Sequence, residues 1–283
     1  MAKNLINATY SPVLRAAADV QAVNGTAGFL WVPPTYTNYA TNSAGVSNRS
    51  VQREGIRITS LELHNRSGGT ASVGIGGRLH NHYWIAGRLS ADDATFTDFT
   101  STAQAREAST LQVTGADQTG FCVLSRHKFD AVSVNISTAE TDDDVGAEND
   151  HTVEYTTGST WTTVGANAAL TDNFTQTNAV WAAAITNFVW LAPPDWTVSD
   201  GLGGVPNGYY GLNFTSAQRE ASDVAAIATG IELFQLIAVE GVADNGVWEI
   251  ETADIRLPYV DGLVAYFSTA NAGNRVMAEV KGG

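Results

Sequence analysis

Two closely spaced histidines are the residues best suited to hold a metal ion. His80 and His82 lie in the segment 78–84, and residues two apart on a β-strand project from the same face of a sheet. Neutral imidazoles in that arrangement could share a zinc or nickel ion, but a third ligand is needed and the sequence identifies none. Two histidines beside an aromatic cluster explain the same residues without a metal. We therefore expect no metal site and no cofactor.

An acidic run at residues 139–151 is the second place where ligands could gather. Its carboxylates are Glu140, Asp142, Asp143, Asp144, Glu148 and Asp150. Calcium prefers oxygen ligands of this kind, but the run does not follow the EF-hand spacing. The segment contains almost no apolar residue, so we interpret it as a solvated loop or linker.

Sequence signatures of catalysis do not occur in the chain. There is no phosphate-binding loop, GxSxG elbow or HExxH pair. The glycines at 74–77 lack dinucleotide-binding spacing, and those at 201–208 fit a loop that needs positive φ. Cys122 is the only cysteine, and its apolar neighbours indicate a buried thiol rather than a nucleophile. Paired carboxylates of a glycosidase would leave no local motif, yet we expect a non-enzymatic protein.

The seven tryptophans and the Asn-x-Ser/Thr triplets are the remaining candidates for binding or modification. Exposed aromatic rings could stack on sugars, so a carbohydrate-binding module is an alternative function. Trp190 and Trp248 lie within strand-like runs, however, and Trp196 follows two prolines, where a large ring more often fills a core. The triplets arise by chance in a chain this rich in Asn, Ser and Thr; they include those at Asn7, Asn65, Asn135 and Asn213.

Composition narrows the class of protein. The chain has 283 residues, of which 44% are hydrophobic and only 16% charged, and its net charge is −14. Such acidity disfavours nucleic acid and anionic membrane surfaces as partners, and the arginines appear scattered. The N-terminal sequence lacks the apolar region of a signal peptide, and no window approaches the length of a membrane span. We therefore expect synthesis as a soluble protein in the cytoplasm.

The elements that must position these residues are short strands. Apolar and β-branched residues alternate in runs that are separated by turn signals roughly every 8–12 residues, as in β-sandwiches. The pattern changes phase near Ser60, which predicts a β-bulge there. The expected strands are 29–32, 56–63, 71–75, 121–124, 131–136, 152–155, 161–164, 188–191, 209–214, 231–239, 247–250, 255–260, 263–268 and 275–280.

The predicted fold is therefore all-β, with two antiparallel, jelly-roll-like β-sandwich domains and an N-terminal arm. The arm comprises residues 1–30, the first domain 31–140 and the second 150–283, with the acidic run as their boundary. Within the arm, Ser11-Pro12 could start a short helix whose apolar face is formed by Val13, Leu14, Ala17 and Val20. An extended tail that packs on its own domain fits the same residues, so both forms remain open.

An internal echo raises the question of duplication. Residues 99–109 and 214–222 become identical when Thr102 and Ala105 are deleted from the first segment. A true repeat would mean two related sandwiches, each with this segment at the same corner. Chance could produce the same match in a chain rich in Ala, Ser and Thr.

Aromatic residues, prolines and glycines recur at a characteristic spacing between about residues 118 and 225. The hairpin Tyr155-Thr-Thr-Gly-Ser-Thr-Trp161 precedes the edge Trp190-Leu-Ala-Pro-Pro-Asp-Trp196, and Gly208-Tyr-Tyr210 begins a closing strand. In the edge, Ala192 and the second proline, Pro194, fill positions between Trp190 and Asp195. This pattern resembles a β-sandwich module of tailed-bacteriophage virion proteins. The resemblance implies a head decoration, cement or head-fibre protein, and it carries no catalytic residues.

The expected function is thus that of a non-enzymatic structural protein of a tailed-phage particle, most plausibly a capsid decoration or cement protein within the virion. The alternative is a tail- or head-attached adhesin or carbohydrate-binding module. The expected partners are the major capsid protein or other virion proteins, together with further copies of the chain, for which a trimer is favoured. The arm would make the contact between copies through Leu5, Ile6, Tyr10, Val13 and Leu14.

Overall fold

Strands make up most of the part of the chain that the structure describes, and helices almost none of it. The computed structural model describes residues 13–14, 28–32, 56–90, 94–105, 111–112, 121–141, 151–165, 168–172, 174–175, 181–183, 185–216, 227–250, 255–269 and 274–282. The strands form antiparallel sheets, so the prediction of an all-β, antiparallel fold is confirmed. The finer prediction of two jelly-roll-like sandwiches remains a prediction. None of the helices in these ranges is long and apolar enough to cross a bilayer.

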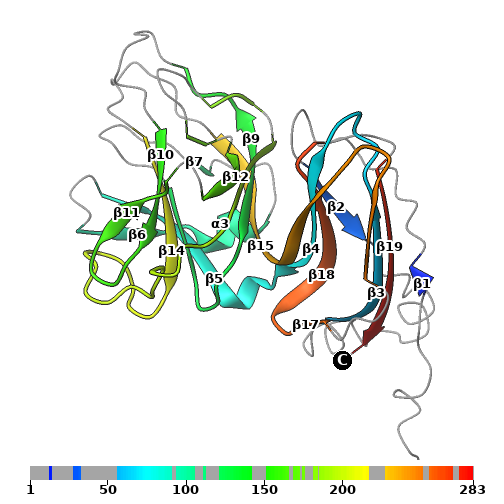
Figure 1. The fold of residues 1–283 in the computed structure, drawn as a ribbon. Helices are drawn as coiled ribbons and strands as arrows, with labels where there is room; N and C mark the ends of the chain where they lie inside the picture. Colours follow the sequence, from blue (N-terminus) through cyan, green and yellow to red (C-terminus); the bar gives the residue numbers. More distant parts are fainter. Residues whose placement is uncertain are drawn as a thin grey trace, which may run out of the picture. The chain divides into compact units, whose positions relative to one another are not determined.

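The chain divides into two units, and unit 1 combines its two ends: residues 1–80 and 234–283. Its sheets appear as two layers in Figure 1. The first has the order β1 (Val13–Leu14), β19 (Arg275–Gly282), β3 (Ile56–His64), β16 (Val247–Ile250), and β17 (Ile255–Leu257) also pairs with β3. The second contains the end of β15 (Ile227–Val242), then β4 (Ala71–Leu79), β18 (Val260–Phe267) and β2 (Gly28–Val32). Buried side chains of both sheets build the core, among them Leu63, Val73, Ile75 and Val264.

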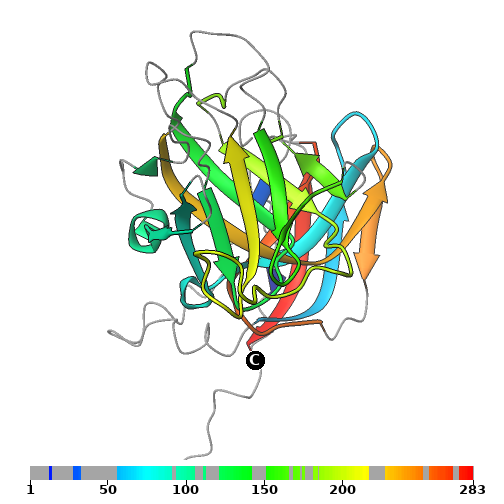
Figure 2. The same cartoon turned by 90° about the vertical axis from the view of Figure 1, so that its left-hand side faces the viewer.

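Unit 2 comprises residues 81–233. Its larger sheet has the order β11 (Trp161–Thr163), β10 (His151–Thr156), β14 (Tyr210–Ser216), β8 (Phe121–Ser125), β5 (Trp84–Leu89), β6 (Phe96–Asp98). Figure 2 shows its central strands side by side, with β14 in yellow. A second group has the order β12 (Ala169–Asp172), β13 (Ile185–Trp190), β9 (Ala131–Thr138) and the start of β15, with which β7 (Leu111–Gln112) also pairs. The core is aromatic: Phe121 stacks on Phe214 at 4.5 Å between ring centroids.

These units differ from the domains that the sequence predicts at 31–140 and 150–283. The late strands β18 and β19 pair with the early strands β2 and β3, so the C-terminal segment belongs with the N-terminal one. The acidic run lies between β9 and β10 in the sequence and therefore falls inside unit 2 instead of at a boundary. Pairing between strands so far apart in the chain leaves no local mark in composition, which explains the difference.

The predicted bulge near Ser60 is confirmed. Opposite β19, the register shifts because Ser60 pairs with Glu279 whereas Ile58 pairs with Val280, which leaves one extra residue in β3. A bulge of this kind changes which residues face the core, and this produces the change of phase in the sequence pattern. A second register shift lies in β15 opposite β4, between Leu236 and Ala238.

Short helices occur only in the connections of unit 2, among the described residues. A 3-10 turn covers Asn81–Tyr83 (η2), and an α-helix covers Thr100–Ala105 (α3). The internal echo is not a structural repeat where both copies are described. Thr100 begins α3, whereas the matching Thr215 lies in β14, and both segments belong to unit 2.

Candidate functional site

Three of the spaced aromatic residues between 118 and 225, Trp190, Trp196 and Tyr210, meet in one aromatic cluster of unit 2. Trp196 is 1% exposed and lies edge-on to Trp190, with 4.6 Å between the ring centroids. It also contacts Tyr210 at 5.2 Å and Phe129 at 5.2 Å. The spacing of aromatic residues around the prolines therefore builds a scaffold, since buried rings contribute large apolar areas and favourable edge-to-face contacts.

A hydrogen bond fixes the proline-containing edge to the neighbouring strand. The hydroxyl of Tyr155 on β10 donates to Asp195, at 3.2 Å from Oδ1 and 3.3 Å from Oδ2. Burial, and then the charge of Asp195 and this hydrogen bond, raise the pKa of Tyr155 above its ordinary value. The phenol is therefore held in its protonated form as a structural donor.

The glycine-rich loop at 199–209 is closed by the hydroxyl of Ser199. Its Oγ donates to the carbonyl of Pro206 at 2.6 Å and accepts from the N–H of Tyr209 at 3.3 Å. Gly201 and Gly208 have φ of 71° and 84°, so the prediction of a loop with positive φ is confirmed. Two apolar side chains of this loop, Leu202 and Val205, pack on a cluster of buried residues that also contains Leu89, Cys122 and Leu124.

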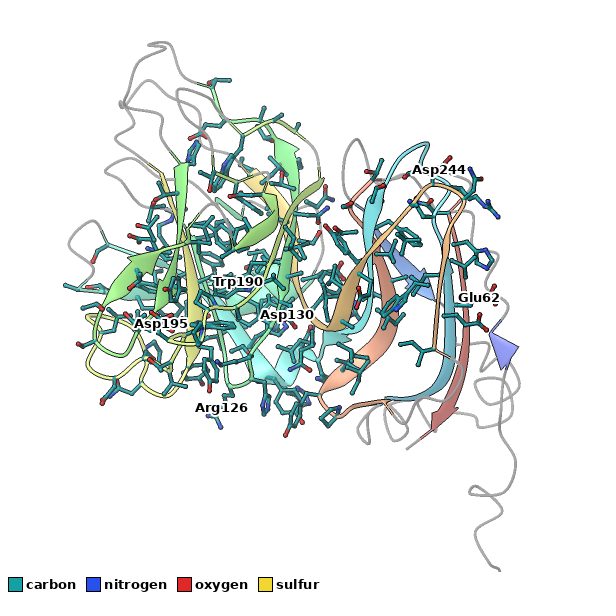
Figure 3. The ribbon with its side chains drawn as sticks, in the orientation of Figure 1. Glu62, Arg126, Asp130, Trp190, Asp195 and Asp244 are labelled. Atoms are coloured by element: carbon teal, nitrogen blue, oxygen red, sulfur yellow. The ribbon has the colours of Figure 1, made fainter. Side chains whose placement is uncertain are left out.

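Beside this loop lies a run of three basic residues, which we call the basic edge: Arg126, His127 and Lys128. These three consecutive residues follow β8, and the side chains of Arg126 and Lys128 are exposed. The backbone N–H of Arg126 donates to the carbonyl of Tyr83 in η2 at 3.0 Å, and that of His127 to Ser125 Oγ at 3.1 Å. Figure 3 shows Arg126 at one end of the unit, beyond the strands. Local hydrogen bonds thus hold the backbone of the basic edge.

The cations of the basic edge form cation–π contacts with aromatic rings. The guanidinium carbon of Arg126 lies 5.6 Å from the ring centroid of Tyr209. Lys128 Nζ lies 5.4 Å from the ring centroid of Tyr210 and 5.7 Å from that of Trp196. Cations within about 6 Å of an aromatic ring are attracted to its face. The two tyrosines at the start of β14 therefore orient one cation each.

His127 lies between these cations and packs edge-on against the ring of Tyr83, at 5.0 Å between centroids. Burial, followed by the positive charge of Arg126, lowers the pKa of His127 below its ordinary value of 6.5. The imidazole is therefore neutral at pH 7, and the basic edge carries two full charges that rise to three in acid.

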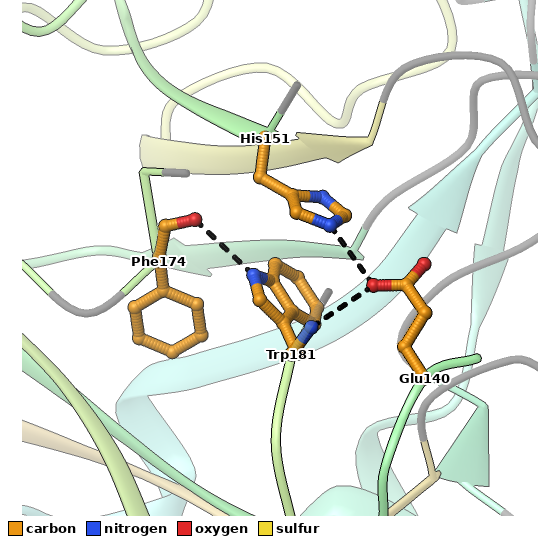
Figure 4. A network of polar contacts seen from close by, with 4 residues as sticks. All are labelled: Glu140, His151, Phe174 and Trp181. Carbon is orange, nitrogen blue, oxygen red and sulfur yellow. Dashed lines mark hydrogen bonds and ion pairs between the residues drawn. The ribbon is translucent and has the colours of Figure 1, made fainter. Parts of the chain in front are cut away.

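A second polar cluster, shown in Figure 4, lies in the interior of unit 2. His151 Nε2 and Glu140 Oε2 are 2.9 Å apart, the separation of an ion pair, and both side chains are 2% exposed. The imidazole of His151 stacks on Trp181 at 4.7 Å between centroids. The N–H of Trp181 donates to Glu140 Oε2 at 3.2 Å, and its indole nitrogen donates to the carbonyl of Phe174 at 3.1 Å. This cluster joins the two flanks of the acidic run.

Most of the described tryptophans serve the core. Trp84, Trp181, Trp190 and Trp196 are at most 2% exposed. Trp161 and Trp248 are half-buried. The interpretation as core residues is confirmed for Trp190 and Trp196, whereas Trp248 is only half-buried. The four buried rings cannot present a flat face to a sugar.

The other candidates from the sequence are dispersed. Cys122 is a fully buried thiol outside any disulfide, as expected. The strand β4 ends at Leu79, and His82 lies in the 3-10 turn η2, so the two histidines do not share the face of a strand. No group of three or more His, Cys, Asp or Glu side chains gathers as a metal site in the described ranges. Asn65 and Asn213 are buried, at 0% and 5% exposure, so neither presents an accessible triplet.

Residues 28–30 of the predicted arm begin β2, and the other described residues of the arm are Val13–Leu14. These residues form β1, in register with Glu279 and Ala278 of β19, which fits the extended form of the arm and not a helix at this point. Leu5, Ile6 and Tyr10 lie outside the described residues, as do Ala17, Val20 and the acidic side chains between 142 and 150. The contact between copies through the arm therefore remains a prediction.

The basic edge is the feature that sequence reasoning missed. The arginines are separated from one another along the chain, and a count of arginine alone does not mark residues 126–128. Counting all three basic residue types would have found the run, since the chain has no other three consecutive basic residues. The aromatic partners Tyr209 and Tyr210 are far from it in the sequence, and only the pairing of β14 with β8 brings them together.

Comparisons with known proteins give no assignment. No family model, no curated protein and no solved structure matches the chain.

Proposed function

We propose that the chain is a non-enzymatic structural protein of a tailed-phage particle, and within the virion a capsid decoration or cement protein. The observation that carries this proposal is the aromatic cluster of unit 2. The resemblance to phage virion modules rests on Tyr155, Trp190, Trp196 and Tyr210, and each of these residues has a defined structural contact there. Aromatic residues that build a scaffold instead of a reactive site fit a protein whose task is to assemble.

The buried position of the acid–base pair supports a role without catalysis. Glu140 and His151 are the kind of pair that could exchange a proton with a substrate, but both side chains are 2% exposed. Trp181 covers one face of the imidazole. A general acid or base must come within hydrogen-bond reach of its substrate, so this pair fits a structural role better.

The rival function is an adhesin or carbohydrate-binding module on the tail or head. It would need exposed rings, and four of the tryptophans are enclosed. The cations over Tyr209 and Tyr210 also occupy faces on which a sugar would have to stack. This geometry favours a protein partner.

The test is binding to phage particles that were assembled without this chain. Light scattering should give the mass of an oligomer, with a trimer favoured, and the protein should co-sediment saturably with those particles. Deleting residues 1–24 should abolish particle binding and leave the thermal unfolding of the rest nearly unchanged. A monomer that does not sediment with the particles would contradict the proposal, and binding to neutral sugars by that monomer would establish the rival.

A further inference from the structure

We propose that the basic edge of unit 2, formed by Arg126, His127 and Lys128, docks onto a carboxylate-rich surface of the shell protein. This inference rests on the proposed function, because it names the surface through which a decoration protein would reach its shell. Three observations carry it: the position of the charges, their fixed orientation, and the contrast with the rest of the chain.

The charges are exposed on a rigid support. The backbone is tied to η2 through the hydrogen bond from Arg126 to Tyr83. Immediately after the edge, Phe129 is fully buried, and its carbonyl accepts a hydrogen bond from the indole of Trp190 at 3.1 Å. The N–H of Trp190 donates to the carbonyl of Asp130 at 3.0 Å. The connection is therefore fastened on both sides, so its cations lose less freedom on binding than cations on a loose loop.

The aromatic rings select the kind of partner. Arg126 over Tyr209 and Lys128 over Tyr210 leave their charges at the surface while their positions are set in advance. An oriented guanidinium can form two parallel hydrogen bonds with a carboxylate, and an ammonium adds a point charge beside it. Because the cations lie over the rings, carboxylates that pair with them fit this surface better than a sugar that stacks.

The charge of the whole chain excludes long polyanions as partners. At a net charge of −14, a nucleic acid or an extended acidic polymer meets repulsion from the rest of the molecule. A compact cluster of Asp and Glu on a folded protein can meet the basic edge without that penalty, because salt screens charges more than about 10 Å away at 0.1 M. Each copy would be held weakly, and repetition over the shell would supply avidity.

The test uses the full chain and particles assembled without it. We expect Arg126→Glu/Lys128→Glu to weaken binding to the particles, measured by co-sedimentation, by about tenfold or more at low salt. The two cations of the basic edge become carboxylates, which repel the carboxylates of the partner. Binding of the unaltered chain should fall as NaCl rises from about 0.05 to about 0.5 M. The matched control Arg66→Glu/Lys281→Glu changes the net charge equally in unit 1 and should bind like the unaltered chain. Circular dichroism and thermal unfolding verify that each variant is folded, and Arg126→Gln/Lys128→Gln provides a milder variant.

A fluorescent peptide with only two or three consecutive glutamates, short enough to lie within the basic edge, separates this inference from the proposed function. If it binds the unaltered chain at low salt and not the double variant, the basic edge prefers carboxylates whether or not particles bind. Equal particle binding by the unaltered chain and the double variant would overturn the inference and leave the proposed function standing. Binding of an oligosialic acid at the basic edge, together with no binding to particles or to the glutamate peptide, would overturn both.

Discussion

The two units close their loop ends with different chemistry. In unit 1, the buried amide of Asn65 donates to the carbonyls of Gly69 at 2.8 Å and Val242 at 2.7 Å. Its oxygen accepts from the N–H of Ser67 at 3.0 Å. In unit 2, the indole of Trp196 stabilises the loop end by packing on the rings of Phe129, Trp190 and Tyr210. The end of unit 1 is fastened by directional hydrogen bonds, whereas at the end of unit 2 buried aromatic area is added to the hydrogen bonds of Tyr155 and Ser199.

This difference decides where each unit can interact. An amide that satisfies backbone groups uses up its own polar atoms, so Asn65 stabilises the loop end of unit 1 and offers no polar group to a partner. Aromatic packing leaves the outer faces of Tyr209 and Tyr210 available for cations, and the basic edge forms there. Unit 2, whose loop end contains the aromatic cluster, therefore carries the exposed positive charges of Arg126 and Lys128, which a partner can contact.

Truncating the ring at the centre of the aromatic cluster should give the largest effect. Trp196→Ala should lower the free energy of unfolding by about 3–5 kcal/mol, as for other buried aromatic residues. Chemical denaturation measures this change. Trp196→Phe, which keeps a ring, serves as the matched control and should lose much less. A loss below about 1 kcal/mol for Trp196→Ala would show that the cluster does not hold the end of unit 2.

Removing the amide that fastens unit 1 should have a smaller effect. Asn65→Ala leaves the carbonyl of Val242 and the N–H of Ser67 without these partners, which should cost about 1–3 kcal/mol. The same denaturation experiment measures it, and the exposed neighbour Thr70→Ala is the control, for which little change is expected. If both substitutions had the same small effect, closure by hydrogen bonds would not stabilise this end of unit 1.

The pH dependence of stability should reveal the environment of His127. Its pKa is lowered in the folded protein, so between that pKa and 6.5 the unfolded chain binds more protons. The contribution of His127 is therefore fully favourable above pH 6.5 and is lost as the pH falls through the folded pKa. His127→Gln should reduce the slope of unfolding free energy against pH between about 7 and about 5. The effect should be small because the imidazole is only half-buried; an unchanged slope would contradict the prediction.

Local patterns in the sequence were enough for most strands and for the bulge near Ser60. They failed for β5, because Gly87 and the aromatic segment before it do not look like a strand. A Cβ at Gly87 would lie 2.3 Å from Cζ of Phe96, so this glycine is required by packing that is visible only in three dimensions. The division into units failed for a similar reason, since β19 pairs with β3 across almost the whole chain.

For the site, the sequence predicted the scaffold better than the surface. The spacing between Trp190 and Trp196 indicated a structural module, and both rings are buried in it. The basic edge depends on Tyr209 and Tyr210, which reach it through strand pairing from about 80 residues away along the chain. Hydrophobic periodicity relates residues only a few positions apart in the sequence. It therefore cannot predict a surface that is assembled from strands far apart along the chain.

The chain enters unit 2 after β4 and returns from it along β15. Arg78 and Phe234 are in register where these strands pair, and antiparallel partners are only about 4.5–5.5 Å apart. Unit 2 is thus an insertion into a hairpin of unit 1, with neighbouring points of departure and return. For engineering, it is a cassette: a short β-turn could replace it, and a foreign domain whose termini lie close together could be displayed in its place.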